Sequence, residues 1–479
     1  MEENIKKNNL SKFRFWFIVL GMGLAGQLCW NMENQWFNTF VYAKISGNVN
    51  IVSWMIIASA IISTLSTFIF GTMSDRIGKR KIFVSTGYIV WGVTTIIFGL
   101  TEYARRSGVA FLVASSGFLV VFMDCVMSFF GSMGNDSGYN TWLNDYTDDT
   151  NKGQVGAALA ALPVLGTVLG TVIGGALINI GNSTAGTLEY DPSLDNYQLL
   201  FWLMGSFVAL IGAMSIFLMK DKDGIKSNKE GPFIKQMFSC FNFKKLKGKE
   251  NIKEMFLACL TASIFFIPFN FYFSHMGNWL IYDIGFSASS MGLIEGISLL
   301  LAVLVTIPVS ILINKDRIPL VVIIAIISNA LGLILTYLLV KDSSSVDVIN
   351  LFSIKNIKLF ICVFLIGVGY VLIMQTSMIW VRGLFPAEAR GQFEGVRILF
   401  FVLIPMLIGT LVGNIIIKNT PQEVVIYDSY NHVIDVPQEN LFIFATIMAL
   451  LTFIPLIFAM KAYKRRMKTK NKQNKIEKE

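Results

Sequence analysis

Long apolar runs alternate with short polar connections along the whole chain. A helix that crosses a bilayer needs about 20 apolar residues, and each run is long enough for one. The first six runs lie near residues 14–42, 51–73, 82–101, 109–143, 154–180 and 197–219. Six more lie near residues 255–281, 288–313, 318–340, 358–385, 393–417 and 441–461. The pattern predicts an all-α membrane protein with twelve transmembrane helices in two six-helix bundles.

Several short features recur at nearly constant spacing, which predicts that the two bundles are pseudo-symmetric repeats. Trp142 and Gly153 recur as Trp380 and Gly391, both at an offset of 238 residues. A polar segment rich in lysine separates the repeats. The predicted parts are an N-terminal tail (1–13), a first bundle (14–219), a basic linker (220–253), a second bundle (254–462) and a basic C-terminal tail (463–479).

The distribution of charge predicts the topology. Only 15% of the 479 residues are charged and 54% are hydrophobic, which excludes an ordinary soluble protein. The net charge is +9, but 31 of the 40 Lys and Arg lie in the tails, the linker and the connections on the same side. The positive-inside rule places both termini and the linker in the cytoplasm of a plasma (inner) membrane protein. The basic residues therefore mark topology and do not predict a nucleic-acid partner.

The sequence offers little for enzymatic or cofactor chemistry. The five cysteines have no paired spacing, and the only histidines are His275 and His432. No HExxH, CxxC or GxxxxGK[ST] motif occurs. We therefore expect no metal site, no cofactor and no enzyme activity, and we expect a monomer that acts on a small solute within the lipid bilayer.

The most specific motif lies between the second and third predicted helices. It reads Gly71-Thr-Met-Ser-Asp75-Arg76-Ile-Gly78-Lys79-Arg80-Lys81. The two glycines allow a tight turn and close helix approach, and the basic cluster stays in water. Asp75 can face the positive end of a neighbouring helix. Charge that only sets topology is the alternative, although it would not require Asp75.

This motif resembles the signature of the major facilitator superfamily, G-x-x-x-D-R-x-G-R-R, and the likeness in architecture extends over nearly the whole chain. The resemblance implies a fold of two bundles that rock around a central site. It also implies a gating role for Gly71, Asp75, Arg76, Gly78 and Arg80.

A second charged set suggests a gate between the bundles. Asp145 follows the fourth helix, and Arg382, Arg390 and Arg397 surround the equivalent connection of the second bundle. Opposite charges on opposite bundles would hold the cytoplasmic side shut. Pairing of Arg397 with its neighbour Glu394 along one helix is the alternative.

Polar and aromatic residues inside apolar helices are the candidates for solute binding, because such groups usually face the bundle interior. Spacings of 4, 7, 11 and 18 residues in the fourth helix predict one narrow polar face. The substrate-binding candidates are Asn31, Asn34, Trp36, Asp124, Asn135, Asp136, Trp142, Asn270, His275, Asn278, Trp279, Gln375 and Trp380.

Four carboxylates within the predicted helices are candidates for coupling to a cation: Glu33, Asp124, Asp136 and Glu295. A carboxylate in low dielectric is easily protonated, so its charge can respond to the side that the site faces. Purely structural hydrogen bonding is the alternative for each.

The stretch Asn135-Asp136-Ser-Gly-Tyr-Asn-Thr-Trp142 loosely resembles the glycoside-pentoside-hexuronide:cation symporters, the melibiose permease-like family. That resemblance implies transport of a sugar with sodium, lithium or protons, with acids on helices one, two and four. The sequence departs from the family at two places. In helix two, Ser63 and Thr67 stand where the family has carboxylates, and in helix one Leu28 stands where the family has an acid.

The sequence as a whole predicts a secondary active transporter that moves a sugar or glycoside by alternating access, coupled to a proton or sodium ion. A drug or metabolite:proton antiporter on the same fold is the first alternative. A polytopic membrane enzyme or a receptor is the alternative outside transport.

Overall fold

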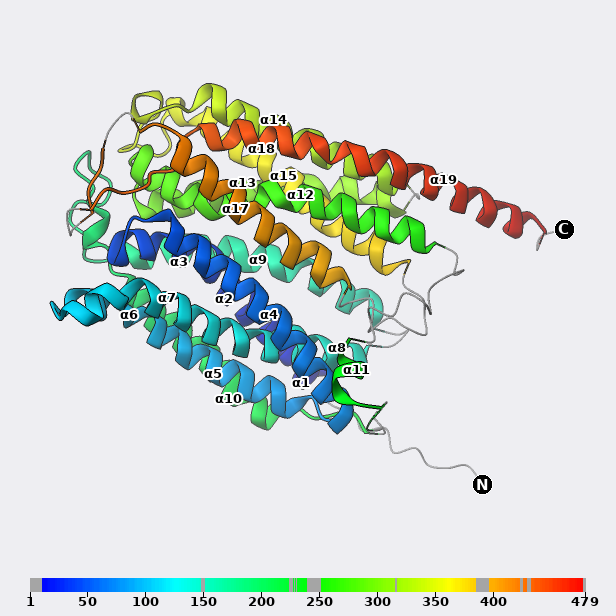
Figure 1. The fold of residues 1–479 in the computed structure, drawn as a ribbon. Coiled ribbons are helices and arrows are strands. Elements are labelled where there is room, and N and C mark those ends of the chain that lie inside the picture. Colours follow the sequence, from blue (N-terminus) through cyan, green and yellow to red (C-terminus); the bar gives the residue numbers. More distant parts are fainter. Residues whose placement is uncertain are drawn as a thin grey trace. The chain divides into compact units, whose positions relative to one another are not determined.

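The computed structural model describes residues 11–147, 151–223, 227, 229, 231–238, 251–314, 317–384, 396–422, 425–428 and 432–476. Within these residues, 12 helices are long and apolar enough to cross a membrane, and they run as long rods (Figure 1). The sole pairing of extended backbone in the same residues is an isolated bridge between Tyr427 and Val433. The predicted all-α class and the twelve spanning helices are confirmed.

The first six spanning helices end within a few residues of their predicted bounds. They are Lys12–Ile45, Val49–Ile77, Lys81–Arg106, Ala110–Tyr146, Gln154–Ile178 and Tyr197–Leu218. Their main elements are α1 (Lys12–Phe17), α2 (Gly23–Asn31) and α3 (Phe37–Phe40) in the first, then α4 (Val49–Ile77), α5 (Lys81–Gly99) with α6 (Thr101–Arg106), α7 (Ala110–Gly131) with α8 (Asn140–Tyr146), α9 (Lys152–Ile178) and α10 (Tyr197–Leu218).

The second six spanning helices follow a short linker helix, α11 (Phe233–Met237). They are Ile252–Asp283, Ala288–Val309, Ile318–Leu339, Ile354–Arg382, Val396–Asn419 and Asn440–Thr469. Their main elements are α12 (Ile252–Asn278), α13 (Ala288–Asn314), α14 (Ile318–Leu339), α15 (Ile357–Arg382), α17 (Ile404–Asn419), and α18 (Asn440–Leu451) with α19 (Phe453–Ile476).

Among the described residues, six wide, π-helical turns occur in the spanning helices, and three of these lie where polar residues gather. These three are η2 (Met32–Trp36) in the first, η4 (Ser132–Tyr139) in the fourth and η8 (Trp279–Asp283) in the seventh. Such turns often occur at functional sites, because the extra residue changes the direction in which side chains point. They also shift the phase of each helix, so residues on either side do not follow a single 3.6-residue face.

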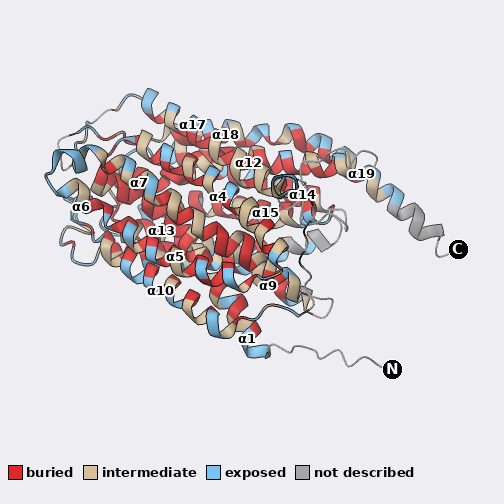
Figure 2. Ribbon diagram, turned by 60° about the horizontal axis from the view of Figure 1, so that its bottom comes forward, coloured by how far each residue is buried: buried red, intermediate tan, exposed pale blue. Residues whose placement is uncertain are grey.

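Apolar side chains cover the outside of the spanning helices. Phe217, near the end of α10, is 79% exposed, and Phe118, within α7, is 73% exposed, although both side chains are large and apolar. Buried and exposed positions follow one another along the same helices (Figure 2). An apolar outer surface of this kind is stable in contact with lipid tails, which are as apolar as the side chains themselves.

The contacts group the chain into two units, and neither is a continuous half of the sequence. The first comprises 1–34, 58–170 and 196–238, and the second comprises 35–57, 171–195 and 239–479. The division into two sequence bundles stays a prediction. The second unit is informative, because it combines the ends of three early helices with all of the last six.

In the second unit, Asp435 joins the connection before α18 to the connection before α4. Its carboxylate accepts a hydrogen bond from the backbone N–H of Val49 (2.9 Å). Its backbone carbonyl accepts one from the hydroxyl of Tyr42 (2.9 Å), and its N–H donates to the carbonyl of Gly47 (2.8 Å). The carboxylate therefore caps the start of α4 from a distant part of the chain.

Glycines bring α5 and α10 into backbone contact in the first unit. A Cβ atom at Gly92 would lie 2.3 Å from the carbonyl oxygen of Gly205 and 2.4 Å from the backbone nitrogen of Ala209. Small residues allow such close approach, which gives helices in lipid much of their van der Waals attraction.

We expect Gly92→Val to destabilise the protein, because the neighbours at this position are backbone atoms that cannot move aside. Overpacking of this kind costs about 1–3 kcal/mol, sometimes more. Gly156→Val is the matched control, since nothing lies within 4 Å of a Cβ at that helical glycine. Thermal unfolding of the purified variants measures both, and equal unfolding midpoints would contradict the predicted close packing.

Candidate functional site

Two buried carboxylates from different helices form the centre of the polar site in the first unit. Glu33 of η2 is 8% exposed and Asp124 of α7 is 1% exposed. The hydroxyl of Ser128 donates to Oε1 of Glu33 (2.8 Å), and Ser59 of α4 lies beside Asp124. Three carboxylate oxygens, Oε2 of Glu33 and both oxygens of Asp124, have no hydrogen bond of ordinary geometry among the described residues. The two carboxylates lie within electrostatic range of each other.

Asp136, the third acid predicted here, lies in η4. Its carboxylate accepts hydrogen bonds from the hydroxyl of Ser132 (2.9 Å) and from the amide of Asn135 (3.2 Å). The amide oxygen of Asn135 accepts one from the hydroxyl of Tyr88 (2.9 Å). Asp136 is within electrostatic range of Glu33, so the structure brings three of the four predicted coupling acids into one region.

Two other candidates of the first helix lie against the fifth, and a third is bound within its own helix. Within the first unit, the side chain of Asn31 occupies the space above Gly170, where a Cβ would lie 2.3 Å from its Oδ1. In the second unit, Trp36 similarly covers Gly174. The amide of Asn34 donates to the carbonyl of Trp30 (2.7 Å) one turn earlier. These three candidates contact helix backbone, and we do not include them in the proposed solute site.

The fourth predicted acid, Glu295 of α13, belongs to a polar cluster in the second unit. Its Oε2 accepts a hydrogen bond from the amide of Gln35, and its Oε1 has no partner in the described part of the chain. Near Gln35 in the first helix, Asn38 donates to the carbonyl of Ser274 (3.0 Å). Gln35 and Ser274 are not among the candidates of the sequence analysis, and Ser274 takes part through its backbone carbonyl, which a residue of any type provides.

Several candidates on α12 and its continuation retain unsatisfied polar atoms. His275 and Asn278 are completely buried. Both ring nitrogens of His275, Oδ1 of Asn278 and Nε1 of Trp279 have no hydrogen-bond partner among the described residues. The same holds for the hydroxyl of Thr376 on α15. Buried polar groups are nearly always hydrogen-bonded, so groups of this kind indicate bound water or a ligand.

Two more candidates on these helices, Asn270 and Gln375, have other surroundings. The amide of Asn270 donates to the carbonyl of Phe266 in its own helix (2.7 Å), and its Cβ lies close to Gly409 of α17. Gln375 of α15 is half-buried. Gln375 directly precedes Thr376, whose hydroxyl has no partner among the described residues, so Gln375 stays a candidate.

Trp142 and Trp380, which recur in the predicted repeat, use their indole N–H groups for anchoring. Trp142 donates to the carbonyl of Lys220 after α10 (2.7 Å). Trp380 donates to the carboxylate of Glu254 at the start of α12 (2.8 Å). Arg466 of α19 also binds Glu254, at 2.9 Å from Nε. Both tryptophans therefore lie at helix ends, and we do not include them in the proposed solute site.

The motif turn after α4 has only part of the geometry that its sequence predicts. The turn forms at Gly78, but the basic cluster does not stay wholly in water, because Arg80 is 5% exposed. Gly78 has a φ of 72°, a conformation that favours glycine. The guanidinium of Arg80 binds the carboxylates of Asp75 (2.7 Å) and Asp145 (3.2 Å). The carboxylate of Asp221 accepts the N–H groups of Arg80 (2.7 Å) and its neighbour in the chain. Among the described residues, no other helix comes within 4 Å of the position that a Cβ would take at Gly71, so the close helix approach predicted for this glycine is wrong.

Arg76 of the same motif contacts the linker. Its Nε donates to the amide oxygen of Gln236 (2.7 Å), it also donates to the carbonyl of Gly231, and its guanidinium lies 5.4 Å from the ring centre of Phe233. Sequence reasoning missed this contact, because the linker shows only a basic composition.

The residues of the predicted charge gate have the following surroundings. Asp145 binds Arg80 of its own unit. Arg397 lies 6.0 Å from the ring centre of Phe401, and Arg382 ends α15. Arg390 lies outside the described residues. The gate between bundles stays a prediction.

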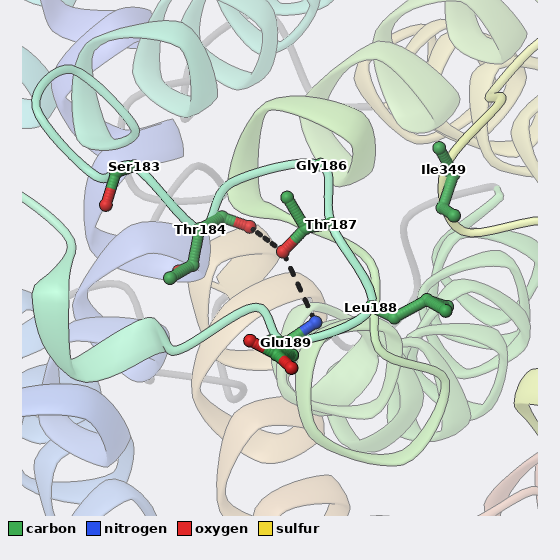
Figure 3. Close-up of a pocket in the computed structure, with 7 residues that line it drawn as sticks. All are labelled: Ser183, Thr184, Gly186, Thr187, Leu188, Glu189 and Ile349. Atoms are coloured by element: carbon green, nitrogen blue, oxygen red, sulfur yellow. Dashed lines mark hydrogen bonds between the residues drawn. The ribbon is translucent and has the colours of Figure 1, made fainter.

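A surface cavity lies between the connection before α10 and the connection after α14 (Figure 3). Leu188 and Ile349 face it from the two sides and are 79% and 58% exposed. Its lining contains one carboxylate, Glu189. It is therefore a shallow feature of the loops, outside the polar clusters described above.

The sequence model of the Major Facilitator Superfamily matches residues 16–279 and 258–479. The chain belongs to this superfamily. It is accordingly a membrane transporter and not an enzyme, and its partners include a small-molecule solute and the lipid around it. No curated protein sequence matches the chain significantly.

Solved structures of transporters share the fold at low sequence identity. A point mutant of the nucleoside transporter NupG has a TM-score of 0.65 at 11% identity, over 94% of this chain and 100% of that one. A bacterial homologue of the human lysosomal transporter Spinster, inward-facing and unoccupied, has a TM-score of 0.58 at 14% identity over 95% and 97%. A bacterial metal transporter has 0.56 at 13% over 94% and 99%.

We expect Arg80→Gln to destabilise the first unit, because it leaves the carboxylates of Asp75 and Asp145 without their cation. Losing a buried, charged hydrogen-bonding partner costs about 1.5–3 kcal/mol. Lys79→Gln removes a charge from the same turn at an exposed position and is the control, with an expected effect near zero. The measurement is thermal unfolding in detergent, and an Arg80 variant as stable as the Lys79 variant would refute this role.

Proposed function

We propose that this transporter carries a small polyhydroxylated solute, a sugar or glycoside, and couples its movement to a proton or sodium ion. The observation that carries the proposal is the pair Glu33 and Asp124, with three buried oxygens that lack hydrogen bonds of ordinary geometry within the described residues. Ionised groups inside a membrane protein are costly unless they are paired or functional.

The chemistry of the pair favours a bound cation. Two neighbouring carboxylates in a low dielectric cannot both be ionised without a counter-charge. Among the described residues, no Lys, Arg or His side chain forms an ion pair with either acid, whereas hydroxyls of Ser128 and Ser59 are adjacent. A proton shared by the acids, or a sodium ion held by carboxylate and hydroxyl oxygens, would satisfy this arrangement.

The solute class rests on the second unit. His275, Asn278 and Trp279 offer donors and acceptors beside aromatic surface, and these groups suit hydroxyls and the apolar face of a sugar ring. Glu295, held by Gln35, is the fourth acid in this proposal. The structural neighbours share the fold alone, so their names do not select the solute.

The position of the tails is also part of the proposal. The concentration of Lys and Arg in the tails and linker supports cytoplasmic termini in the plasma membrane. On this topology, the connections at Gly47, Asn182 and Asp435 face the outside.

The solute class is tested by a thermal-shift screen of sugars, glycosides, nucleosides, amino acids and cationic drugs. For the best ligand, we expect His275→Ala and Asn278→Ala each to weaken binding about tenfold, as the loss of one or two buried hydrogen bonds would. Thr336→Val is the control, because its hydroxyl donates to its own helix backbone at Gly332. Stabilisation by cationic drugs alone, with efflux driven by a pH gradient, would support an antiporter instead.

The coupling role is tested with the same ligand in proteoliposomes under an imposed proton or sodium gradient. We expect Glu33→Gln and Asp124→Asn to abolish uphill accumulation while exchange of labelled solute down its gradient continues. Asp136→Asn should act in the same direction. Glu102→Gln is the matched control, since this buried acid pairs with Arg106 (3.3 Å). Normal accumulation by the Glu33 and Asp124 variants would exclude the proposed coupling.

A further inference from the structure

A buried carboxylate outside the membrane-spanning segments joins the early helices to the late ones in the second unit. Asp195 precedes α10 and is 2% exposed. Its Oδ1 accepts hydrogen bonds from the amides of Asn179 (2.7 Å) and Asn182 (2.8 Å). Its Oδ2 accepts one from the hydroxyl of Tyr190 (2.5 Å). Three donors thus surround a single carboxylate.

Two of these donors continue to the start of α13. The hydroxyl of Tyr190 accepts a hydrogen bond from the backbone N–H of Ala288 (3.2 Å), and Oδ1 of Asn179 accepts one from the N–H of Ser289 (2.7 Å). These N–H groups belong to the first turn of a helix, where backbone donors have no partner within the helix and carry partial positive charge. Asp195 is therefore linked through two side chains to the positive end of α13.

The helices behind this network are in backbone contact. A Cβ at Gly175 of α9 would lie 2.4 Å from the carbonyl oxygen of Ala288, and a Cβ at Gly292 of α13 would lie 2.3 Å from that of Thr171. The network around Asp195 thus spans the place where α9 meets α13. We call Asn179, Asn182, Tyr190 and Asp195, with the first turn of α13, the Asp195 latch.

We propose that the Asp195 latch is a proton-controlled clasp that holds α9 against α13 and so keeps this end of the transporter closed. Alternating access requires contacts between early and late helices to break during each cycle. Separation of α9 from α13 would release Tyr190 and Asn179 from the backbone of α13 and expose the carboxylate to water.

Two titratable groups from other elements lie near Asp195. The ammonium of Lys44 in η3 (Val41–Ile45) donates to the carbonyl of Ser193 (2.6 Å) and exerts an attractive field on Asp195. Tyr282 of η8 lies within electrostatic range of both Asp195 and Asp191. Asp195 forms no ion pair with any of these groups in the described part of the chain.

The direction of the pH effect follows from the burial of Asp195. Burial raises the pKa of this carboxyl from 3.8 to about 6, against the opposing effect of its hydrogen bonds. In the released state the side chain would be hydrated and its pKa would be ordinary. The closed state thus binds the proton more tightly, so closure is favoured below about pH 4 and loses this advantage as the pH rises through 6. A difference of about two pKa units changes the closed-to-open ratio about 100-fold.

The shallow cavity of Figure 3 provides the measurement, because Leu188 and Ile349 line it from the connections before α10 and after α14. Spin labels at these two positions, in full-length protein with its native cysteines replaced, report the distance between the connections by pulsed electron resonance. We expect a short-distance population that dominates at pH 4.5 and decreases by pH 7.5, in nanodiscs and without solute.

Three variants define the role of the latch. Asp195→Asn keeps the size and most hydrogen bonds of the protonated acid, so its short-distance population should be high and independent of pH. Tyr190→Phe should reduce that population at every pH and retain a pH dependence. Asp191→Asn is the control, since its exposed carboxylate caps the N–H of Ser193 (2.8 Å) and should leave the wild-type titration unchanged.

Either of two results would overturn the proposal: a wild-type distance that does not change between pH 4.5 and 7.5, or an Asp195→Asn protein that titrates like the wild type. The readout needs no solute, so it is separate from the coupling proposed for Glu33 and Asp124. Glu33→Gln should preserve the pH-dependent distance even where it abolishes accumulation. Failure of that coupling would therefore leave the Asp195 latch intact.

Discussion

The cost of a polar group without a partner in hydrocarbon governs most of this structure. Spanning segments satisfy their backbone groups within helices, and the few polar side chains must find partners inside the protein. Most do so at short range: Ser, Thr and Asn side chains bond the carbonyl one turn earlier, as Thr64 does with Ala60 (2.8 Å). Against that background, Glu33 and Asp124 are the two neighbouring acids that keep oxygens without a hydrogen bond of ordinary geometry among the described residues. A mobile cation is the partner that the proposed function gives them.

Helix packing follows a second consequence of the same environment. In lipid, apolar contact between helices has no water to exclude, so attraction depends on close approach. Backbone contact at Gly92 with Gly205, and at Gly175 with Ala288, supplies it in each unit. The first contact joins neighbouring helices of the predicted first bundle, whereas the second joins an early helix to a late one. On the proposed cycle the first contact is kept and the second breaks, and the hydrogen bonds that accompany the second are ones that water can replace.

The sequence predicted the elements of the fold closely and the site only in part. Hydropathy alone located twelve helices. Gly78 predicted a tight turn, because few residues other than glycine adopt the positive φ that this turn requires. The polar faces were harder. Regular 3.6-residue spacing placed Asp124, Asn135 and Trp142 on one face, but η4 contains Asn135 and separates Asp124 from Trp142. Trp142 instead donates a hydrogen bond to the carbonyl of Lys220. A wide turn has no clear signature in one sequence. The Asp195 latch was also missed. Its side chains lie in a connection whose sequence shows no motif, and their contact with the start of α13 is visible only in the folded chain.

The end of the second unit that carries these connections is held by carboxylates that bind the starts of helices. Asp435 binds the N–H of Val49 at the start of α4 directly, and Asp195 reaches the start of α13 through Tyr190 and Asn179. Each hydrogen bond contributes only about 0.5–1.5 kcal/mol net, because water can replace it. Apolar burial would give a closure that is stronger but harder to open, whereas helix starts retain good solvation when they separate. Closure through capped helix ends therefore suits a gate that must open in every transport cycle, and it gives titratable groups a direct influence on that gate.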